Sequence, residues 1–216
     1  EKYEQIRTLR IGDWKYMRSF QPYYPDGMQN NYRYKQLAFR EWRELFNRGE
    51  LNEAQIQFFQ PKSAELLFDL SIDPHEIRNL ADEPAHQPRL VAMRKELTKK
   101  LKDLPDLSMY PENVLYDSAM NNPVKYGQEN KEQIGKLIDT ATLMLEPFHE
   151  AQTDLSEALA TEDPYQRYWA ATACAYCGEE ASDLSDLAMP LLDDENPMVR
   201  VRAAEFLGRI GKVDPR

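Results

Sequence analysis

A nine-residue pattern that occurs twice, 33 positions apart, restricts the fold of this chain more than any other feature. Residues 163–171 read DPYQRYWAA and residues 196–204 read NPMVRVRAA, so both share Asp/Asn-Pro-x-x-Arg-x-x-Ala-Ala. A glycine recurs at the same offset, as Gly178 and Gly211. An Asp or Asn accepts hydrogen bonds from the free N–H groups that begin a helix, and Pro fits the first turn. The pattern therefore predicts two equivalent helices.

The segments before these helices also follow the 33-residue offset. Residues 155–159 correspond to residues 188–192, and residues 131–145 are expected to form a degenerate first helix of the same register. The pattern resembles a HEAT-like repeat, in which pairs of antiparallel helices stack into a solenoid. A stack that ended at Arg216 would leave an apolar face uncovered, so we expect further repeats to follow.

The N-terminal part mixes strands with helices. In residues 6–11 and 14–20, the side-chain types alternate with a period of two, as in β-strands. Gly12-Asp13 separates these two runs, which predicts a β-hairpin with a two-residue turn. A third strand is predicted at 65–70. The intervening residues 21–27, QPYYPDG, are predicted to form an aromatic loop.

Three helices are predicted in the same part. The first has Phe39, Trp42 and Phe46 on one face and ends at Gly49. The second spans 52–59 with Asn52 as its cap, and the third carries an apolar face over 90–101. Strands and helices that mix without regular alternation favour an α+β fold, a small antiparallel sheet with packed helices, followed by the all-α HEAT-like solenoid.

The expected domain organisation has three parts. Residues 1–104 form the mixed domain, residues 105–130 form a linker or wrapping segment rich in Pro, Asn, Asp and Tyr, and residues 131–216 form the HEAT-like repeats. Within the linker, one short helix is predicted at 112–120.

Two motifs in the mixed domain resemble the sulfatase family. Residues 64–81, AELLFDLSIDPHEIRNLA, are similar to its C-terminal signature Glu-x-Leu-Tyr/Phe-Asp-Leu-x-x-Asp-Pro-x-Glu-x-x-Asn-Leu-Ala. Residues 9–20, LRIGDWKYMRSF, are similar to its Arg-x-Gly-x-x-Lys-Tyr-Ile-Arg-Asn-Phe hairpin. The two motifs occur in the family's order, and residues 1–104 resemble the C-terminal subdomain of bacterial heparan N-sulfatase-like members.

The resemblance implies a missing catalytic domain as the partner of this fragment. That domain would carry calcium and a formylglycine made from a Cys/Ser-x-Pro-x-Arg motif, and it would hydrolyse sulfate esters or N-sulfates on glycans. The sequence has no such motif, and Cys174-Ala175-Tyr176-Cys177 lacks both the Pro and the Arg. We therefore expect no cofactor in this fragment and no catalysis by it alone. The family is commonly exported, so a periplasmic or secreted location is expected.

Aromatic and basic residues of the N-terminal part are the candidate substrate-binding residues. Tyrosine faces and the planar guanidinium fork suit an anionic sugar, because Arg offers parallel donors to a sulfate or carboxylate. The alternative is that these tyrosines pack against the missing catalytic domain. The candidates are Arg18, Tyr23, Tyr24 and Arg33.

Other reactive residue types are interpreted as structural. Asp73 is expected to cap a turn by accepting backbone N–H groups. The histidines at 75, 86 and 149 lack the spacing of metal ligands, and Cys174 and Cys177 are expected to be buried small residues.

The composition excludes some functions. The 27 Lys and Arg against 37 Asp and Glu give a net charge of −10, which argues against a nucleic-acid partner. No apolar run approaches the roughly 20 residues of a bilayer span, so no membrane partner is expected. The second hypothesis is a non-catalytic protein-binding scaffold built on the repeats. Exposed faces would also allow a homo-oligomer.

Overall fold

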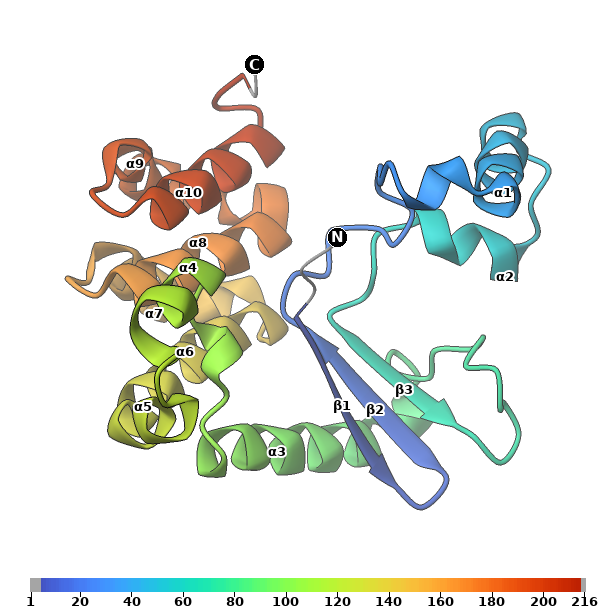
Figure 1. Cartoon of the computed structure of the whole chain (residues 1–216), viewed down its shortest axis with the longest axis horizontal. Coiled ribbons are helices and arrows are strands. Elements are labelled where there is room, and N and C mark those ends of the chain that lie inside the picture. The colour runs from blue at the N-terminus through green and yellow to red at the C-terminus, as the bar shows by residue number, and fades with distance from the viewer. Residues whose placement is uncertain (1–4, 215–216) are drawn as a thin grey trace. The chain divides into compact units, whose positions relative to one another are not determined.

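The computed structural model describes residues 5–214 and divides into two compact units, one up to Leu97 and one from Thr98 onward (Figure 1). The N-terminal unit contains the sheet, and the C-terminal unit is helical. The predicted α+β class is therefore confirmed. Among the described residues, no helix is both long enough and apolar enough to cross a membrane.

The sheet of the N-terminal unit has three antiparallel strands in the order β1-β2-β3. They are β1 (Ile6–Ile11), β2 (Trp14–Ser19) and β3 (Glu65–Asp69). The predicted hairpin is confirmed, and Gly12 has the positive φ of 60° that its tight turn requires. In the register, Tyr16 is the partner of Leu67. Both side chains are fully buried, so they mark the centre of this core.

The predicted helices of this unit are also present. They are α1 (Leu37–Arg48), α2 (Glu53–Ile56) continued by a 3₁₀ turn at Gln57–Phe59, and α3 (Gln87–Asp103). Asn52 caps α2 through a capping box with Gln55, and Gly49 ends α1 in the left-handed conformation. Helix α3 buries the apolar face predicted for it, whereas α1 has no buried residue.

The C-terminal unit is a succession of helices. The first are α4 (Glu112–Val114), which continues as a π-helical segment at Leu115–Ala119, and α5 (Pro123–Glu129). The helix predicted at 112–120 is thus present. Five further helices follow α5 in the described residues: α6 (Lys131–Thr142), α7 (Phe148–Ala160), α8 (Pro164–Cys177), α9 (Ser185–Ala188) and α10 (Pro197–Arg209).

The two repeated motifs begin α8 and α10 in the same way. Asp163 accepts a hydrogen bond from the Tyr165 amide at 2.8 Å, and Asn196 accepts one from the Met198 amide at 2.9 Å. Both helices start with Pro at the first turn. Gly178 and Gly211 follow them with φ of 60° and 68°. The predicted equivalence of the two helices is confirmed.

The partner helices of the repeats are less alike than the sequence predicts. Helix α7 is continuous over 13 residues, whereas its counterpart is the four-residue α9 followed by a 3₁₀ turn at Met189–Asp193. Pro190 lies in this turn and cannot donate the backbone hydrogen bond that a longer α-helix would need. A further 3₁₀ segment, Gly178–Leu184, precedes α9, so the first helix of the second repeat is irregular and largely 3₁₀.

Candidate functional site

The aromatic loop at 21–27 is fixed to the segment that follows α2. The Lys62 amide donates to the Pro22 carbonyl at 2.7 Å, and the Lys62 ammonium pairs with the Asp26 carboxylate at 2.9 Å. The Gly27 amide donates to the Phe58 carbonyl at 2.6 Å. These contacts give the loop one defined conformation.

Glycine is required at position 27 because the chain passes close to an aromatic ring. A Cβ added at Gly27 would lie 2.5 Å from Cδ1 of Phe59, which is closer than side chains approach. The Gly27 carbonyl accepts a hydrogen bond from the Tyr34 hydroxyl at 2.5 Å. The end of the loop is thereby packed against the helical segment.

Tyr23 and Tyr24 have different environments within this loop. Their rings lie 4.8 Å apart between centroids and are tilted by 56°. Tyr23 is buried and Tyr24 is half-buried. Tyr24 therefore offers more of its ring to a ligand than Tyr23 does.

Arg33 connects the loop to aromatic residues of α1 and of the 3₁₀ turn that follows α2. Its Nη1 donates to the carbonyl of Asp26, and its guanidinium lies 5.6 Å from the Phe39 ring centroid and 5.3 Å from that of Phe58. Among residues 5–214, no hydrogen-bond partner is found for Nε or Nη2 of Arg33. The free edge of this half-buried guanidinium could bind a planar anion.

An aromatic cluster supports the Arg33 side chain. Its rings stack face to face, with 4.4 Å between Trp42 and Phe58 and 4.4 Å between Phe46 and Phe59. The stack joins α1 to the 3₁₀ turn after α2. The sequence predicted the apolar face of α1, but it did not predict that this face stacks on Phe58 and Phe59. The only local signal for this stacking was the occurrence of two consecutive phenylalanines shortly before Pro61.

Arg18 is held inside the N-terminal unit. Its side chain is only 3% exposed, its Nη1 donates to the carbonyls of Ser19 and Ala64 at 3.0 and 3.2 Å, and its guanidinium lies 5.0 Å from the Phe20 ring centroid. These contacts connect the end of β2 to the segment before β3. The structure thus brings Tyr23, Tyr24 and Arg33 to the loop region and places Arg18 in the neighbouring core.

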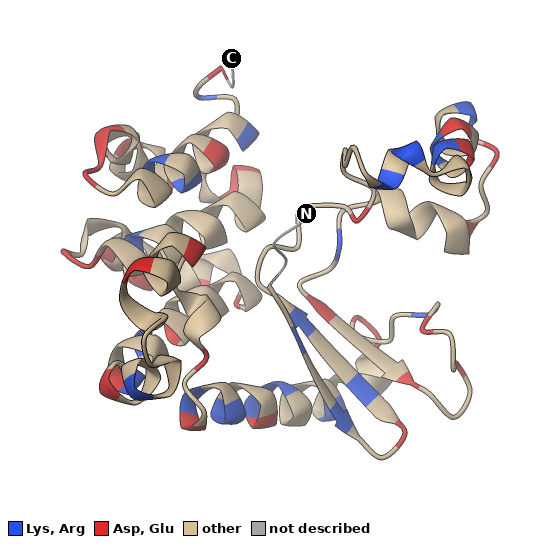
Figure 2. Ribbon diagram, in the orientation of Figure 1, with Lys and Arg blue, Asp and Glu red and all other residues tan. Residues whose placement is uncertain are grey.

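The segment from Arg33 to Arg48 is basic, although the protein has a net charge of −10. Residues 31–48 contain five Lys and Arg residues against two Glu residues. Figure 2 shows this as basic colour on α1 and on the turn before it. Arg43 stacks on the Tyr34 ring at 3.9 Å and donates to the Gln29 side chain at 2.6 Å. The region combines positive charge with aromatic faces, as an anionic sugar would require.

The last part of the signature motif, residues 73–81, closes the edge of the sheet. The Asn79 carboxamide oxygen accepts from the amides of Leu67 and Ala81 at 2.9 and 3.1 Å, and its nitrogen donates to the Glu65 carbonyl at 3.2 Å. Asn79 therefore satisfies the backbone groups of β3 that have no neighbouring strand. The side chain of Asp73 accepts from the Arg78 amide at 2.9 Å, and this hydrogen bond lowers the pKa of Asp73. The structural interpretation of this motif is confirmed.

Glu65 holds α3 to the sheet. Its carboxylate accepts from the Tyr16 hydroxyl at 2.6 Å and from Nε and Nη2 of Arg94 at 2.7 and 2.5 Å. Burial, followed by the nearby Glu65 charge, raises the pKa of Tyr16. The phenol stays protonated and serves as a donor.

A pocket of about 540 Å³ lies on the other side of the sheet, toward α2. Apolar side chains including Met17, Leu66 and Phe58 line it together with Gln57, Lys62 and other polar residues. The Lys15–Glu76 ion pair, with both carboxylate oxygens within 2.7 Å of the ammonium, lies beside it. This mixed lining would accept a ligand with both apolar and charged parts.

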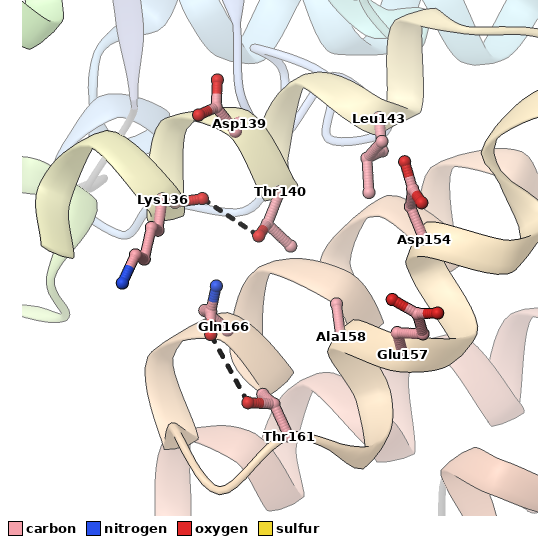
Figure 3. Close-up of a pocket in the computed structure, with 9 residues that line it drawn as sticks. All are labelled: Lys136, Asp139, Thr140, Leu143, Asp154, Glu157, Ala158, Thr161 and Gln166. Atoms are coloured by element: carbon pink, nitrogen blue, oxygen red, sulfur yellow. Dashed lines mark hydrogen bonds between the residues drawn. The ribbon is translucent and has the colours of Figure 1, made fainter. Parts of the chain in front are cut away.

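A second pocket, of about 370 Å³, lies among α6, α7 and the start of α8 (Figure 3). Its charged lining is formed by Lys136, Asp139, Asp154 and Glu157. Thr140 beside them donates to the Lys136 carbonyl at 3.0 Å, and Asp139 pairs with Lys102 at 2.5 Å. The pocket has a mixed polar and apolar lining, and the charge of Asp139 is already paired with that of Lys102.

The thiols and histidines do not form a reactive centre among the described residues. Cys174 is fully buried, and burial raises the pKa values of both thiols, that of Cys177 to about 11. Both cysteines are therefore thiols at neutral pH. Cys174 is buried as predicted, whereas Cys177, which was also predicted to be buried, is only half-buried. No group of three or more His, Cys, Asp or Glu residues in the described part could hold a metal ion. No catalytic step through calcium or formylglycine can be derived from these residues.

Comparisons with known proteins agree with the two resemblances. A family model of HEAT repeats matches residues 153–216, which confirms the predicted repeats there. An ulvan-active sulfatase from Formosa agariphila is 37% identical over 117 residues, which cover 54% of this chain and 20% of that enzyme. The chain therefore spans about a fifth of the length of the relative that it matches, and the match supports a relation to sulfatases. No solved structure matches.

Proposed function

We propose that this chain is the C-terminal portion of a sulfatase that hydrolyses sulfate esters or N-sulfates on a glycan. The observation that carries the proposal is the 37% identity to a sulfatase. The contacts of Asn79 and Glu65 support it, because they give the residues of the signature motif a defined structural role in a C-terminal subdomain. Calcium and formylglycine would then be supplied by a catalytic domain outside this chain, and a periplasmic or secreted location is part of the proposal.

The basic and aromatic region around the loop would contribute to substrate binding. Arg33 would bind a sulfate through its free Nε and Nη2 edge, and Tyr24 would stack on a sugar ring. Arg18 and Tyr23, which are buried, would position the loop for these contacts. The relative is named for activity on ulvan, so a sulfated polysaccharide of that kind is the first substrate to test.

The proposal is tested with the full-length protein that contains this chain. Sulfate release from ulvan and from N-sulfated and O-sulfated glycans is measured by ion chromatography. Activity on any of them supports the proposal, and its absence on the whole panel, in a folded protein supplied with calcium, would contradict it. The 216-residue chain alone is assayed beside it and should release no sulfate.

The binding role of Arg33 is tested separately in the same enzyme. Arg33→Ala should raise KM for the glycan at least about tenfold and leave kcat nearly unchanged, since a charge-assisted hydrogen bond to substrate contributes about 1.5–3 kcal/mol. Arg48→Ala is the control, because Arg48 lies at the end of α1, the helix that follows the 3₁₀ turn of Arg33, and it is exposed and pairs with Glu50 at 3.0 Å. An unchanged KM for Arg33→Ala would show that the aromatic cluster serves packing alone.

A protein-binding scaffold is the second candidate function. The HEAT repeats at 153–216 support it, because stacked repeats present extended surfaces for protein partners. A folded full-length protein without sulfatase activity, from which deletion of residues 131–216 removes a bound protein partner, would favour the scaffold.

A further inference from the structure

Two half-buried arginines of the N-terminal unit, Arg33 and Arg43, have no carboxylate partner among the described residues. By contrast, several other half-buried or buried cations of the protein each pair with a carboxylate. These pairs are Lys15–Glu76, Lys62–Asp26, Arg94–Glu65, Arg167–Asp194 and Arg202–Glu205. A guanidinium that has lost part of its hydration without gaining a counter-ion is suited to bind an anion from outside the chain.

Aromatic rings support both guanidinium groups. That of Arg43 lies 3.9 Å from the ring centroid of Tyr34, which is only 7% exposed. That of Arg33 lies 5.6 Å from the Phe39 centroid and 5.3 Å from the Phe58 centroid. Phe39 and Arg43 are four residues apart on α1, a spacing that places them on the same face of the helix. Stacking on a ring orients the planar group and leaves its N–H edge available.

Each guanidinium is held by a neutral acceptor through a single nitrogen. Nη1 of Arg43 donates to the Gln29 side-chain oxygen at 2.6 Å, and Nη1 of Arg33 donates to the Asp26 carbonyl. Within residues 5–214, Nε and Nη2 of both arginines have no hydrogen-bond partner. Each arginine therefore presents the two parallel donors that fit two oxygens of one carboxylate or sulfate.

The two arginines are attached to the same end of the aromatic loop. Nη1 of Arg33 binds the carbonyl of Asp26, and the hydroxyl of Tyr34, on which Arg43 stacks, binds the next carbonyl, that of Gly27, at 2.5 Å. Both pairs of free donors therefore belong to one part of the surface, the basic region of α1 and the turn before it (Figure 2).

We propose that Arg33 and Arg43 together bind a polyanionic glycan through anionic groups on two neighbouring sugars. The two pairs of free donors supply complementary charge, and Tyr32, which precedes Arg33 and is 78% exposed, offers its ring to a sugar. Because the whole protein carries a net charge of −10, the attraction is confined to this region. The choice of a glycan rests on the proposed function, whereas Arg43 and the second anionic group are additions to it.

The test measures binding rather than sulfate release. The 216-residue chain and the full-length protein that contains it are titrated with ulvan oligosaccharides by isothermal titration calorimetry, and a chelator prevents turnover in the full-length protein. Arg43→Gln should weaken binding about tenfold, and Arg33→Gln combined with Arg43→Gln should weaken it more than either change alone. Arg40→Gln is the matched control, because it removes the same charge from an exposed position on α1 and should change the affinity less than twofold.

Two further ligands test the class of the occupant. Glucose 6-sulfate carries a single anionic group and should bind at least tenfold more weakly than the oligosaccharide. Polyphosphate, a polyanion without sugar rings, should also bind at least tenfold more weakly. Equal affinity for polyphosphate and ulvan would overturn the assignment to a glycan, and equal affinity for the singly charged sugar would overturn the use of two anionic groups.

A variant of Gln29 separates binding from local structure. Gln29→Ala removes the hydrogen-bond partner of Arg43 but keeps the Arg43 charge, and Gln29 is exposed, so the affinity should stay within twofold. Circular dichroism and thermal unfolding compare the fold of all variants. An equal loss of affinity for Gln29→Ala and Arg43→Gln would reduce Arg43 to a structural role and overturn the proposal.

Three further results would overturn the proposal. They are an unchanged affinity in Arg43→Gln, an equal loss in the Arg40→Gln control, and binding by the 216-residue chain but not by the full-length protein, whose other residues would then supply the counter-ions. Failure here is distinct from failure of the proposed function. Glycan binding without sulfate release from any glycan contradicts only the proposed function, whereas sulfate release with unchanged binding in Arg43→Gln contradicts only the role of Arg43.

Discussion

The two units of this protein are stabilised in different ways. In the N-terminal unit, α1 buries no residue, and side chains such as Asn79 and Glu65 connect the sheet to its surroundings through hydrogen bonds. In the C-terminal unit, eight of the 14 residues of α8 are buried among neighbouring helices. A repeat that stacks on its neighbours can gain stability from apolar packing, whereas a three-stranded sheet with free edges must satisfy its backbone groups individually.

The largest expected effect concerns two tryptophans, one in each unit. Trp169 is completely buried and donates to the Met109 carbonyl at 2.8 Å, so Trp169→Ala should lower the free energy of unfolding by about 3–5 kcal/mol. Trp42→Ala, in the half-buried cluster of α1, should cost about 1–2 kcal/mol. Urea unfolding followed by circular dichroism measures both. Equal losses would contradict the contrast between the units.

The Arg167–Asp194 pair between the repeats should come next. Its side chains are 16% and 5% exposed, and removing one partner with Asp194→Asn should cost about 3 kcal/mol. Lys99→Ala, which breaks the exposed pair with Asp103, is the control and should cost less than about 0.5 kcal/mol. Similar losses of unfolding free energy for the two variants would show that the pair between the repeats stabilises the protein no more than an exposed surface pair does.

The same pair should make the C-terminal unit sensitive to acid. Burial raises the pKa of Asp194, but the hydrogen bonds from Arg167 and from the Asn196 amide outweigh it, and the pKa lies below its ordinary value of 3.8. Its contribution to stability is therefore present above pH 3.8 and is lost as the pH falls through the lowered pKa. Thermal unfolding between pH 6 and pH 2.5 should show a smaller loss at the acid end for Asp194→Asn. An identical slope would contradict this.

In the N-terminal unit, the edge of the sheet gives the next effect. Asn79→Ala leaves the Leu67 amide and the Glu65 carbonyl without their side-chain partner and should cost about 2 kcal/mol. Hydrogen exchange should be faster at Leu67 than in the wild-type protein. Asn79→Asp, which keeps the acceptor but loses the donor, should cost less. If both variants exchange like the wild type, Asn79 does not protect the strand.

The smallest effect concerns the equivalent caps of the two repeats. Asn196→Ala should cost about 1 kcal/mol, as loss of a helix cap usually does. Asp163→Ala should cost more, because Asp163 also accepts a hydrogen bond from Gln133. Thermal unfolding of the two variants compares the repeats directly. A larger loss for Asn196→Ala would reverse the expected order.

Much of the fold could be predicted because its signals are local. A turn or a helix start is determined by contacts with residues only a few positions away. This holds for Gly12 in the hairpin turn, for Asn52 before α2, and for the Asp163 and Asn196 motifs. The first helix of the second repeat is the exception, because the alignment of residues 188–192 with residues 155–159 predicts a helix like that of the first repeat. Pro190 lacks the backbone N–H that a regular α-helix needs, so the structure there is 3₁₀.

The candidate site was predicted less completely, because its properties depend on contacts between distant residues. Arg18 lies in a predicted strand and Arg33 lies beyond the aromatic loop, but neither position shows how far the side chain is buried. Arg18 is 3% exposed and bound to the Ala64 carbonyl, 46 residues away. Arg33 keeps a free edge above rings that come from two separate segments. The burial of each arginine therefore depends on residues that are distant in the sequence.

The repeat, the helix caps, the hairpin and the signature motif can all be recognised from the amino-acid sequence, because each depends on spacing along the chain. The sequence does not show that Asn79 completes the edge of β3 or that Asp194 binds the Arg167 guanidinium. These outcomes depend on which distant groups meet in the folded chain, and burial and hydrogen-bond partners exist only once that packing is formed.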